Sequence, residues 1–128
     1  MFDFQKLDVY IKAKHFHAEI SAFISSRPLN KSISDQLFRA SLSVPLNIAE
    51  GSGRFSKPDR RNYFGIARSS VFETVAILDI LTDSDKILPD EFLGFQSKAD
   101  VLSRMLFTTF EIHLMVSPIT GALTQPTE

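Results

Sequence analysis

Hydrophobic residues recur every three or four positions along four long segments of the chain, and no segment alternates hydrophobic with polar residues over a sustained run. This spacing predicts helices at residues 4–26, 32–51, 58–83 and 89–117. The breaks between the helices are short, which favours antiparallel neighbours packed around one core. We therefore expect an all-α fold, an antiparallel up-and-down four-helix bundle at residues 1–118, followed by a flexible C-terminal tail at residues 119–128.

Local sequence signals predict how these helices begin, bend and end. Ser32 is placed to cap the second helix and Ser56 the third, because serine side chains accept hydrogen bonds from the first N–H groups of a helix. Pro45 lies inside the hydrophobic repeat of the second helix, and it predicts a kink because the repeat keeps its phase across it. The Gly-Ser-Gly run at residues 51–53 predicts a helix stop in left-handed backbone.

The hydrophobic stripes of the first, third and fourth helices are wider than one core face requires. The chain holds 12 phenylalanines against 2 tyrosines and no tryptophan, and phenylalanine is the aromatic residue without a polar group. Either these helices are buried on two sides, or the extra apolar residues are simply exposed, which is common in proteins. The phenylalanine content favours the first interpretation. We therefore expect self-association, with the surplus stripes packed between subunits.

Length and composition indicate a single soluble domain of 128 residues. The absence of cysteine excludes disulfides, thiolate metal sites and cysteine nucleophiles, and it fits a reducing cytoplasm. No basic segment followed by an apolar run opens the chain, and no apolar run approaches the ~20 residues of a membrane span. We expect a cytoplasmic protein that has no contact with membranes.

Residue types that carry chemistry are present, but not in the arrangements that catalysis or metal binding requires. His15 and His17 lie about 200° apart around a helix and therefore do not share a ligand. No glutamate is followed three residues later by a histidine, the pattern of di-metal helical bundles. No serine lies in a Gly-x-Ser-x-Gly elbow, and the glycines at 51–53 lack the Gly-Lys-Ser/Thr of a phosphate loop. We expect no enzymatic activity, metal, cofactor or small-molecule substrate.

Charge is unevenly distributed along the chain. The formal net charge is −1, which opposes strong non-specific binding to polyanions. Acidic residues dominate residues 73–100, whereas residues 54–68 contain a single acid, Asp59. The basic residues of that second stretch are Arg54, Lys57, Arg60, Arg61 and Arg68. Cations around the start of a helix favour phosphate binding, but they are equally consistent with a solvated face of ordinary ion pairs.

A polar group is expected where the second helix ends. Asn47, Glu50 and Arg54 are three and four residues apart, so they stack along one side of a helix, next to apolar positions. A partly buried Glu50 needs a cation, which Arg54 or Arg39 could supply. The group either fixes the corner between the second and third helices or contacts a ligand or nucleic acid. If Glu50 is buried and paired, Glu50→Ala destabilises the protein more than Glu19→Ala.

The same region resembles a known family. The run SVPLNIAEGSGR at residues 43–54, followed by Asp59, YF at 63–64 and ARSSVFE at 67–73, is similar to small four-helix bundle proteins called 23S ribosomal RNA intervening-sequence proteins. Accessory variability proteins of diversity-generating retroelements are related to them. The resemblance implies a ring-like homopentamer, and the retroelement members act with a reverse transcriptase and its RNA through a basic surface.

The resemblance also bears on individual residues and on function. It assigns Asn47, Glu50, Gly51, Arg54 and Glu73 to fold and assembly. The pI of about 6.3 departs from the basic character of the nucleic-acid-binding members. We interpret the chain as a non-enzymatic homo-oligomeric scaffold that binds RNA or an RNA–protein complex, with a protein–protein adaptor as the alternative. The predicted RNA contacts are Arg54, Lys57, Arg60, Arg61 and Arg68.

Overall fold

The computed structural model describes the backbone of residues 1–116 and the side chains of residues 1–108. Its elements are a short 3-10 helix η1 (Asp3–Lys6) and the helices α1 (Asp8–Ser25), α2 (Lys31–Ser52), α3 (Lys57–Asp83) and α4 (Pro89–Val116). No strand occurs at residues 1–116, so the predicted all-α class with four long helices is confirmed. The tail predicted at 119–128 lies outside the described residues.

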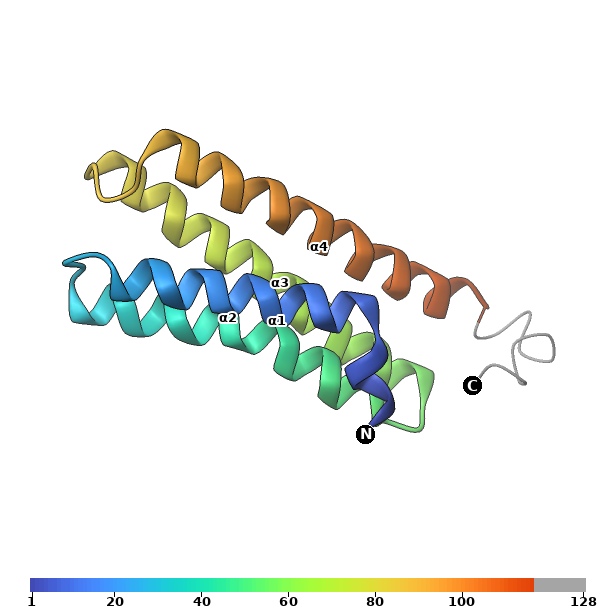
Figure 1. The fold of residues 1–128 in the computed structure, drawn as a ribbon. Helices are drawn as coiled ribbons and strands as arrows, with labels where there is room; N and C mark the ends of the chain where they lie inside the picture. The colour runs from blue at the N-terminus through green and yellow to red at the C-terminus, as the bar shows by residue number, and fades with distance from the viewer. Residues whose placement is uncertain (117–128) are drawn as a thin grey trace.

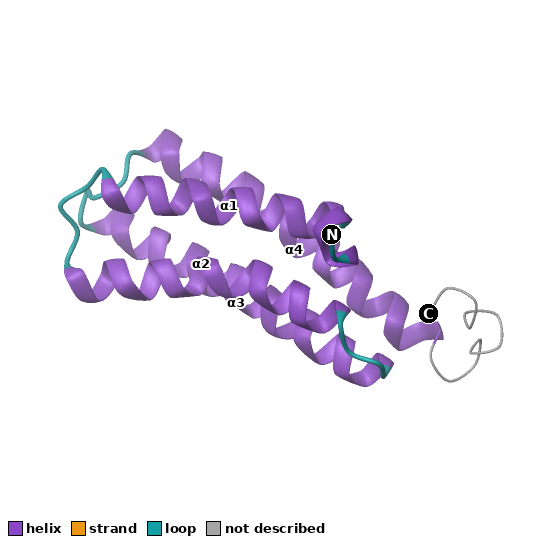
Figure 2. Ribbon diagram, turned by 60° about the horizontal axis from the view of Figure 1, so that its bottom comes forward, coloured by secondary structure: helices purple, strands orange, loops and turns teal. Residues whose placement is uncertain are grey.

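The four helices run lengthwise, with the loops confined to the two ends of the molecule (Figure 2). Figure 1 shows the α1–α2 and α3–α4 turns at one end, and the α2–α3 turn with the N-terminus at the other. α2 packs closely against α1 and α3, and α3 packs closely against α4, whereas α1 and α4 meet less closely. None of the helices, as far as they are described, is long and apolar enough to cross a membrane.

The helix ends follow the sequence signals in part. Ser56 caps α3 as predicted, because its Oγ accepts a hydrogen bond from the Asp59 N–H at 3.2 Å. The predicted cap of α2 is wrong, since Asn30 takes this role and its Oδ1 accepts from the N–H groups of Ser32 (2.8 Å) and Ile33 (3.3 Å). α2 continues through Pro45, as the unbroken hydrophobic repeat indicated.

The left-handed stop predicted at residues 51–53 is also wrong. Gly53 caps α2 with φ −90°, and no glycine in the described part of the chain has a positive φ. Among the described residues, Asp85 in the α3–α4 turn has left-handed backbone, with φ 57°. Gly51 therefore needs another explanation, which the packing of α2 on α3 provides.

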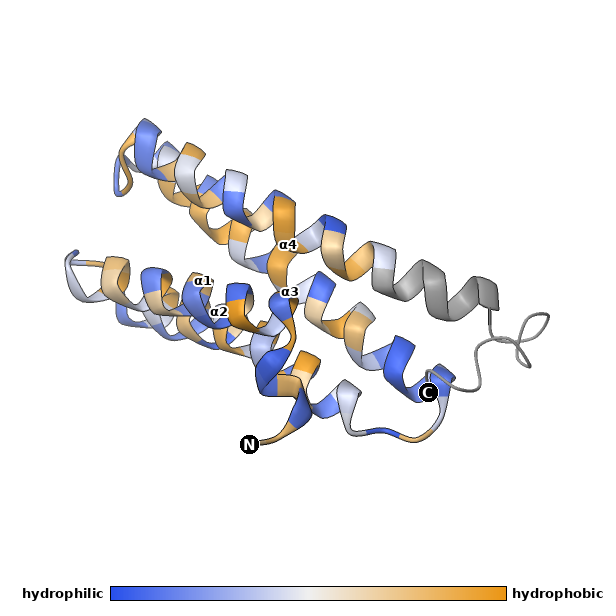
Figure 3. Ribbon diagram, turned by 45° about the vertical axis from the view of Figure 1, so that its right-hand side comes forward, coloured by the Kyte–Doolittle hydropathy of each residue, from blue (hydrophilic) through white to orange (hydrophobic). Residues whose placement is uncertain are grey.

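The core lies between the four helices, and hydrophobic positions recur along each of them (Figure 3). Phe16 and Phe23 of α1 meet Phe95 of α4 edge-on, with ring centroids 6.5 and 5.7 Å apart. Burying one such side chain stabilises a protein by about 1.5–3 kcal/mol relative to leaving it exposed. The largest fully buried apolar side chains are Phe16, Ile20, Leu37, Ile48, Leu78, Leu102, Leu106, Val44 and Val71.

Apolar side chains also remain at the surface. In the first predicted helix, at residues 4–26, Leu7, Ala18 and Ala22 are exposed, although α1 itself exposes no large apolar side chain. α2, for which no surplus was predicted, exposes Phe38 and Leu46. The surplus on the third and fourth helices is confirmed within residues 1–108, where Ile66, Phe72, Ile80, Leu93, Val101 and Phe107 are exposed.

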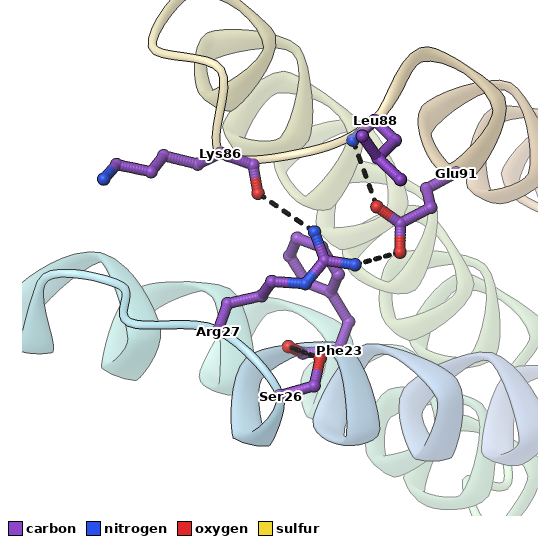
Figure 4. Close-up of polar contacts among 6 residues, drawn as sticks. All are labelled: Phe23, Ser26, Arg27, Lys86, Leu88 and Glu91. Carbon is purple, nitrogen blue, oxygen red and sulfur yellow. Dashed lines mark hydrogen bonds and ion pairs between the residues drawn. The ribbon is translucent and has the colours of Figure 1, made fainter.

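Arg27 joins the two turns at one end of the bundle (Figure 4). Its guanidinium pairs with the carboxylate of Glu91 in α4, donates to the carbonyl of Lys86 at 3.4 Å, and lies 4.8 Å from the ring centroid of Phe23. Glu91 in turn accepts a hydrogen bond from the Leu88 N–H at 3.0 Å. Partial burial opposes ionisation of Glu91, but these hydrogen bonds prevail and lower its pKa.

Candidate nucleic-acid interface

The corner between α2 and α3 is held by Arg54, which follows the last turn of α2. Its Nη2 donates to Glu50 Oε2 at 2.9 Å and to the Tyr63 hydroxyl at 2.6 Å, and its guanidinium lies 4.7 Å from the Tyr63 ring centroid. The hydrogen bond to Glu50 is the main reason why the pKa of Arg54 is raised. The predicted pairing of Glu50 with an arginine is confirmed, and the partner is Arg54.

The predicted burial of Glu50 is wrong, because its side chain is 56% exposed. The carboxylate lies at the rim of the corner, where water solvates it. An exposed ion pair of this kind contributes little to stability. Glu50 therefore does not hold a buried polar cluster together.

Asn47 lies one turn before Glu50 on α2, as the helical spacing indicated, but its hydrogen bonds go to neither Glu50 nor Arg54. Its amide donates back along α2, to the carbonyl and the hydroxyl of Ser43 at 2.8 and 2.9 Å. The Ser43 hydroxyl also accepts from Ser70 of α3 at 2.8 Å. Asn47 thus supports a polar contact between α2 and α3.

Gly51 and Glu73 both lie at contacts between α2 and α3, at different positions along the two helices. Gly51 is buried, and a Cβ built on it would stand 2.8 Å from the Cβ of Tyr63 and 3.4 Å from the carbonyl oxygen of Arg60. Glu73, nearer the other end of α3, accepts a hydrogen bond from Gln36 Nε2 of α2 at 3.5 Å. The close helix approach at Gly51 explains why a glycine stands there.

Three of the five basic residues gather at the α2–α3 turn. Arg60 donates through Nη1 to the carbonyls of Arg54 and Phe55, at 2.8 and 2.7 Å, and so fastens the turn. Lys57 begins α3 and is half-buried. Arg54 and Arg60 are therefore engaged in holding the fold, which reduces what they offer to a partner.

The other two, Arg61 and Arg68, lie farther along α3. Arg61 is half-buried and lines a hollow of about 540 Å³. Arg68 lines an adjoining hollow of about 380 Å³, and Gly65 and Ser69 line both. The predicted cluster of five cations is thus divided into a turn group (Arg54, Lys57 and Arg60) and a helix group (Arg61 and Arg68).

Arg68 has partners that its neighbours in the sequence do not reveal. Its Nε donates to the carbonyl of Ser103 in α4 at 3.2 Å. Its guanidinium lies 4.8 Å from the ring centroid of Phe72 and 5.1 Å from that of Phe107. We call Arg68, Phe72 and Phe107 the Arg68 stack. The sequence analysis considered phenylalanine only as a core or interface residue and therefore missed this stack. The available signal in the sequence was a phenylalanine four positions after a basic residue.

The structure also pairs a serine with a histidine that the sequence left apart. Ser41 Oγ lies 2.8 Å from His17 Nδ1, and it donates its own proton to the carbonyl of Phe38 at 3.2 Å. Ser41 is completely buried, and burial lowers the pKa of His17. The contact joins α1 to α2 inside the bundle. Within residues 1–108, no group of histidine and acidic side chains is arranged to hold a metal ion.

The family profile described as 23S rRNA-intervening sequence protein matches residues 5–108. The chain belongs to this family. The profile spans the motif at residues 43–54, the turn group and the helix group, so the family resemblance inferred from the motif is confirmed. None of the curated proteins searched matches the chain.

A solved structure shares the fold. A protein with unknown function from the S23 ribosomal protein family of Bacteroides thetaiotaomicron VPI-5482 superposes with a TM-score of 0.75 and 22% sequence identity. The match covers 80% of this chain and 97% of that chain. At this identity the likeness shows the fold of the two proteins alone.

Proposed function

We propose that this protein is a non-enzymatic helical scaffold that binds RNA, free or within an RNA–protein complex, through the surface around the first half of α3. The observation that carries the proposal is the placement of Arg61 and Arg68 on adjoining hollows. Within residues 1–108, Arg61 has no hydrogen bond or ion pair, and Arg68 donates a hydrogen bond only through Nε. Both guanidinium groups are thus available to phosphate oxygens. An RNA partner also fits the family of the chain, whose description names 23S rRNA.

The charges elsewhere on the helix pair favour one end for this contact. Lys57 and the capped start of α3 adjoin the helix group, and Asp59 is the one acid of this half, whereas the second half of α3 contains the acids Glu73, Asp79 and Asp83. Asp90 and Glu91 open α4 beside that second half. RNA phosphates are attracted to the first half of α3 and repelled from the second. A small net negative charge is compatible with binding when the cations are gathered in this way.

The scaffold part of the proposal is an antiparallel up-and-down bundle that assembles as a homopentamer with a cytoplasmic location. The exposed apolar side chains of α2, α3 and α4 support self-association, and the family resemblance supports five subunits. A ring would repeat the helix group once per subunit, so that weak single contacts add through avidity. Light scattering on a chromatographed sample tests this: a pentamer mass is expected, and a monomer at micromolar concentration contradicts it.

A second candidate function is a protein–protein adaptor without nucleic-acid contact. Phe38 and Leu46 favour it, because they are exposed apolar residues two helical turns apart on α2. Neither belongs to the hollows that Arg61 and Arg68 line. RNA binding decides between the two functions, since apolar protein contacts do not weaken with salt as phosphate contacts do.

The test is RNA binding at low salt, measured by fluorescence anisotropy for the wild type, Arg61→Glu and Lys31→Glu. Both variants change the net charge equally, but Lys31 is an exposed residue paired with Asp35 at the opposite end of α2. We expect Arg61→Glu to weaken binding and Lys31→Glu to leave it nearly unchanged. Equal loss in both would mean that RNA responds to total charge alone, and no binding by the wild type would favour the adaptor.

A further inference from the structure

The Arg68 stack joins α3 to α4 at the surface of the molecule. Phe72 follows Arg68 by one turn of α3, and Phe107 comes from α4, so the guanidinium contacts rings from two helices. The hydrogen bond from Arg68 Nε to the Ser103 carbonyl holds the guanidinium in place. This arrangement is fixed by packing before any partner arrives, and preorganisation of this kind favours binding.

Both rings of the stack are open to solvent. Phe72 is 55% exposed and Phe107 46% exposed, although phenylalanine has no polar group that gains from contact with water. The hollow that they line with Arg68 is completed by Gly65 and Ser69, and Gly65 carries no side chain to fill it. A flat group can therefore reach the rings and the guanidinium from outside.

We infer that this stack binds the unpaired bases of single-stranded RNA, so that Phe72 and Phe107 supply base contacts where Arg61 and Arg68 supply phosphate contacts. The inference rests on the proposed function and specifies its ligand. Aromatic rings and arginine planes are the groups on which proteins stack the bases of single strands. The bases of a duplex are paired and stacked on one another, and are not available to such a platform.

The remaining donors of Arg68 favour RNA over an apolar protein surface at this place. Within the described side chains, its Nη groups have no hydrogen-bond partner. A second copy of the chain covering the stack with apolar side chains would leave those donors buried without acceptors, which is costly for a charged group. Phosphate oxygens and the edges of bases provide acceptors while the bases cover the rings.

The charges on either side of the stack determine the path of the RNA strand across the surface. Towards the start of α3, the adjoining hollow is lined by Arg61 and by one acid, Glu73. In the other direction, Phe72 borders a third hollow, which is lined by Asp79 and Asp100 and by no basic residue of the described part of the chain. Phosphates are repelled there, so the strand runs from the Arg68 stack towards Arg61 and the α2–α3 turn.

The test compares a short fluorescent RNA strand with the same strand paired to its complement, in anisotropy titrations at low salt. We expect the wild type to bind the single strand more tightly. Phe72→Ala and Phe107→Ala should each lower single-strand affinity by roughly 5- to 100-fold and leave duplex affinity unchanged. Phe72→Tyr keeps the aromatic ring and should retain affinity. Ile80→Ala, at a position of α3 that is 59% exposed, is the matched control for removal of a surface apolar group.

The possible outcomes separate this inference from the proposed function. If RNA binds but the two alanine variants lose nothing, or lose duplex and single strand equally, the stacking inference is wrong and the proposed function stands. If either variant changes the oligomer mass in light scattering, the stack is a subunit interface and the inference is likewise wrong. If the wild type binds neither RNA, both fail. Unfolding midpoints of the variants establish that each is folded.

Discussion

Tyr63 of α3 lies against Gly51 of α2 so closely that a Cβ on Gly51 would stand 2.8 Å from the Cβ of Tyr63. Gly51 contributes no side chain to this contact, which lies immediately before the turn that Arg54 and Arg60 fasten. The direction in which α3 leaves this turn depends on that contact. The position of the helix group on α3 therefore depends on a glycine in α2.

Replacing Gly51 should destabilise the protein. Gly51→Ala forces the Cβ of Tyr63, which is attached directly to the backbone, to move, and overpacking of this kind costs about 1–3 kcal/mol. Gly94→Ala is the matched control, because nothing lies within 4 Å of a Cβ there and alanine is the better helix former by about 0.8–1 kcal/mol. Urea unfolding at one fixed protein concentration should show a lower midpoint for Gly51→Ala and a higher one for Gly94→Ala.

Replacing Glu50 should have a small effect. Its side chain is more than half exposed and pairs with Arg54 just beyond the end of α2, so water replaces most of what the pair provides. We expect Glu50→Ala and Glu19→Ala to lower the unfolding midpoint by similar, small amounts, since Glu19 is also a surface residue paired with a lysine, Lys98. A much larger loss for Glu50→Ala would mean that the corner is buried, for example by another subunit.

Stability should fall in acid partly because of Glu91. The hydrogen bonds from Leu88 and Arg27 lower its pKa in the folded protein, so its contribution is present at neutral pH and is lost as pH falls through and below the ordinary value of 4.5. Glu91→Gln should therefore lower the unfolding midpoint at pH 7 more than at pH 3. Arg27→Gln removes one of the two partners and should weaken the same pH dependence. An unchanged pH dependence in both variants would contradict the account.

The fold could be predicted from the sequence because periodicity depends on local spacing, and the four helices follow it closely. Cap positions were less certain: Asn30 and Ser32 are both good capping residues, and only the path of the chain before α2 selects Asn30. The role of Gly51 was missed for a related reason. A glycine at a helix end indicates left-handed backbone or a close neighbour, and the neighbour, Tyr63, belongs to another helix.

The candidate site was predicted less well, because its contacts cross between helices. Arg68 was grouped with Arg54 by nearness in the sequence, whereas it is Ser103, 35 positions away, that fixes its direction. Phe107 completes the stack from the same helix as Ser103. Nothing in helical spacing relates residues on α3 to these residues of α4. The basic residues could be identified from the sequence, but the side chains and carbonyls that surround them could be identified only from the packed structure.

The dependence of RNA affinity on salt tests the central claim, that phosphates bind along the first half of α3. Each phosphate contact contributes roughly 0.7 to the slope of log affinity against log salt for a single strand. We expect the wild type to show a measurable slope and Arg61→Glu to flatten it by about that amount, with the oligomer mass unchanged. Lys31→Glu should keep the wild-type slope. Phosphate binding along the first half of α3 is contradicted if the wild type binds no RNA even at low salt, or if Arg61→Glu binds with the wild-type slope.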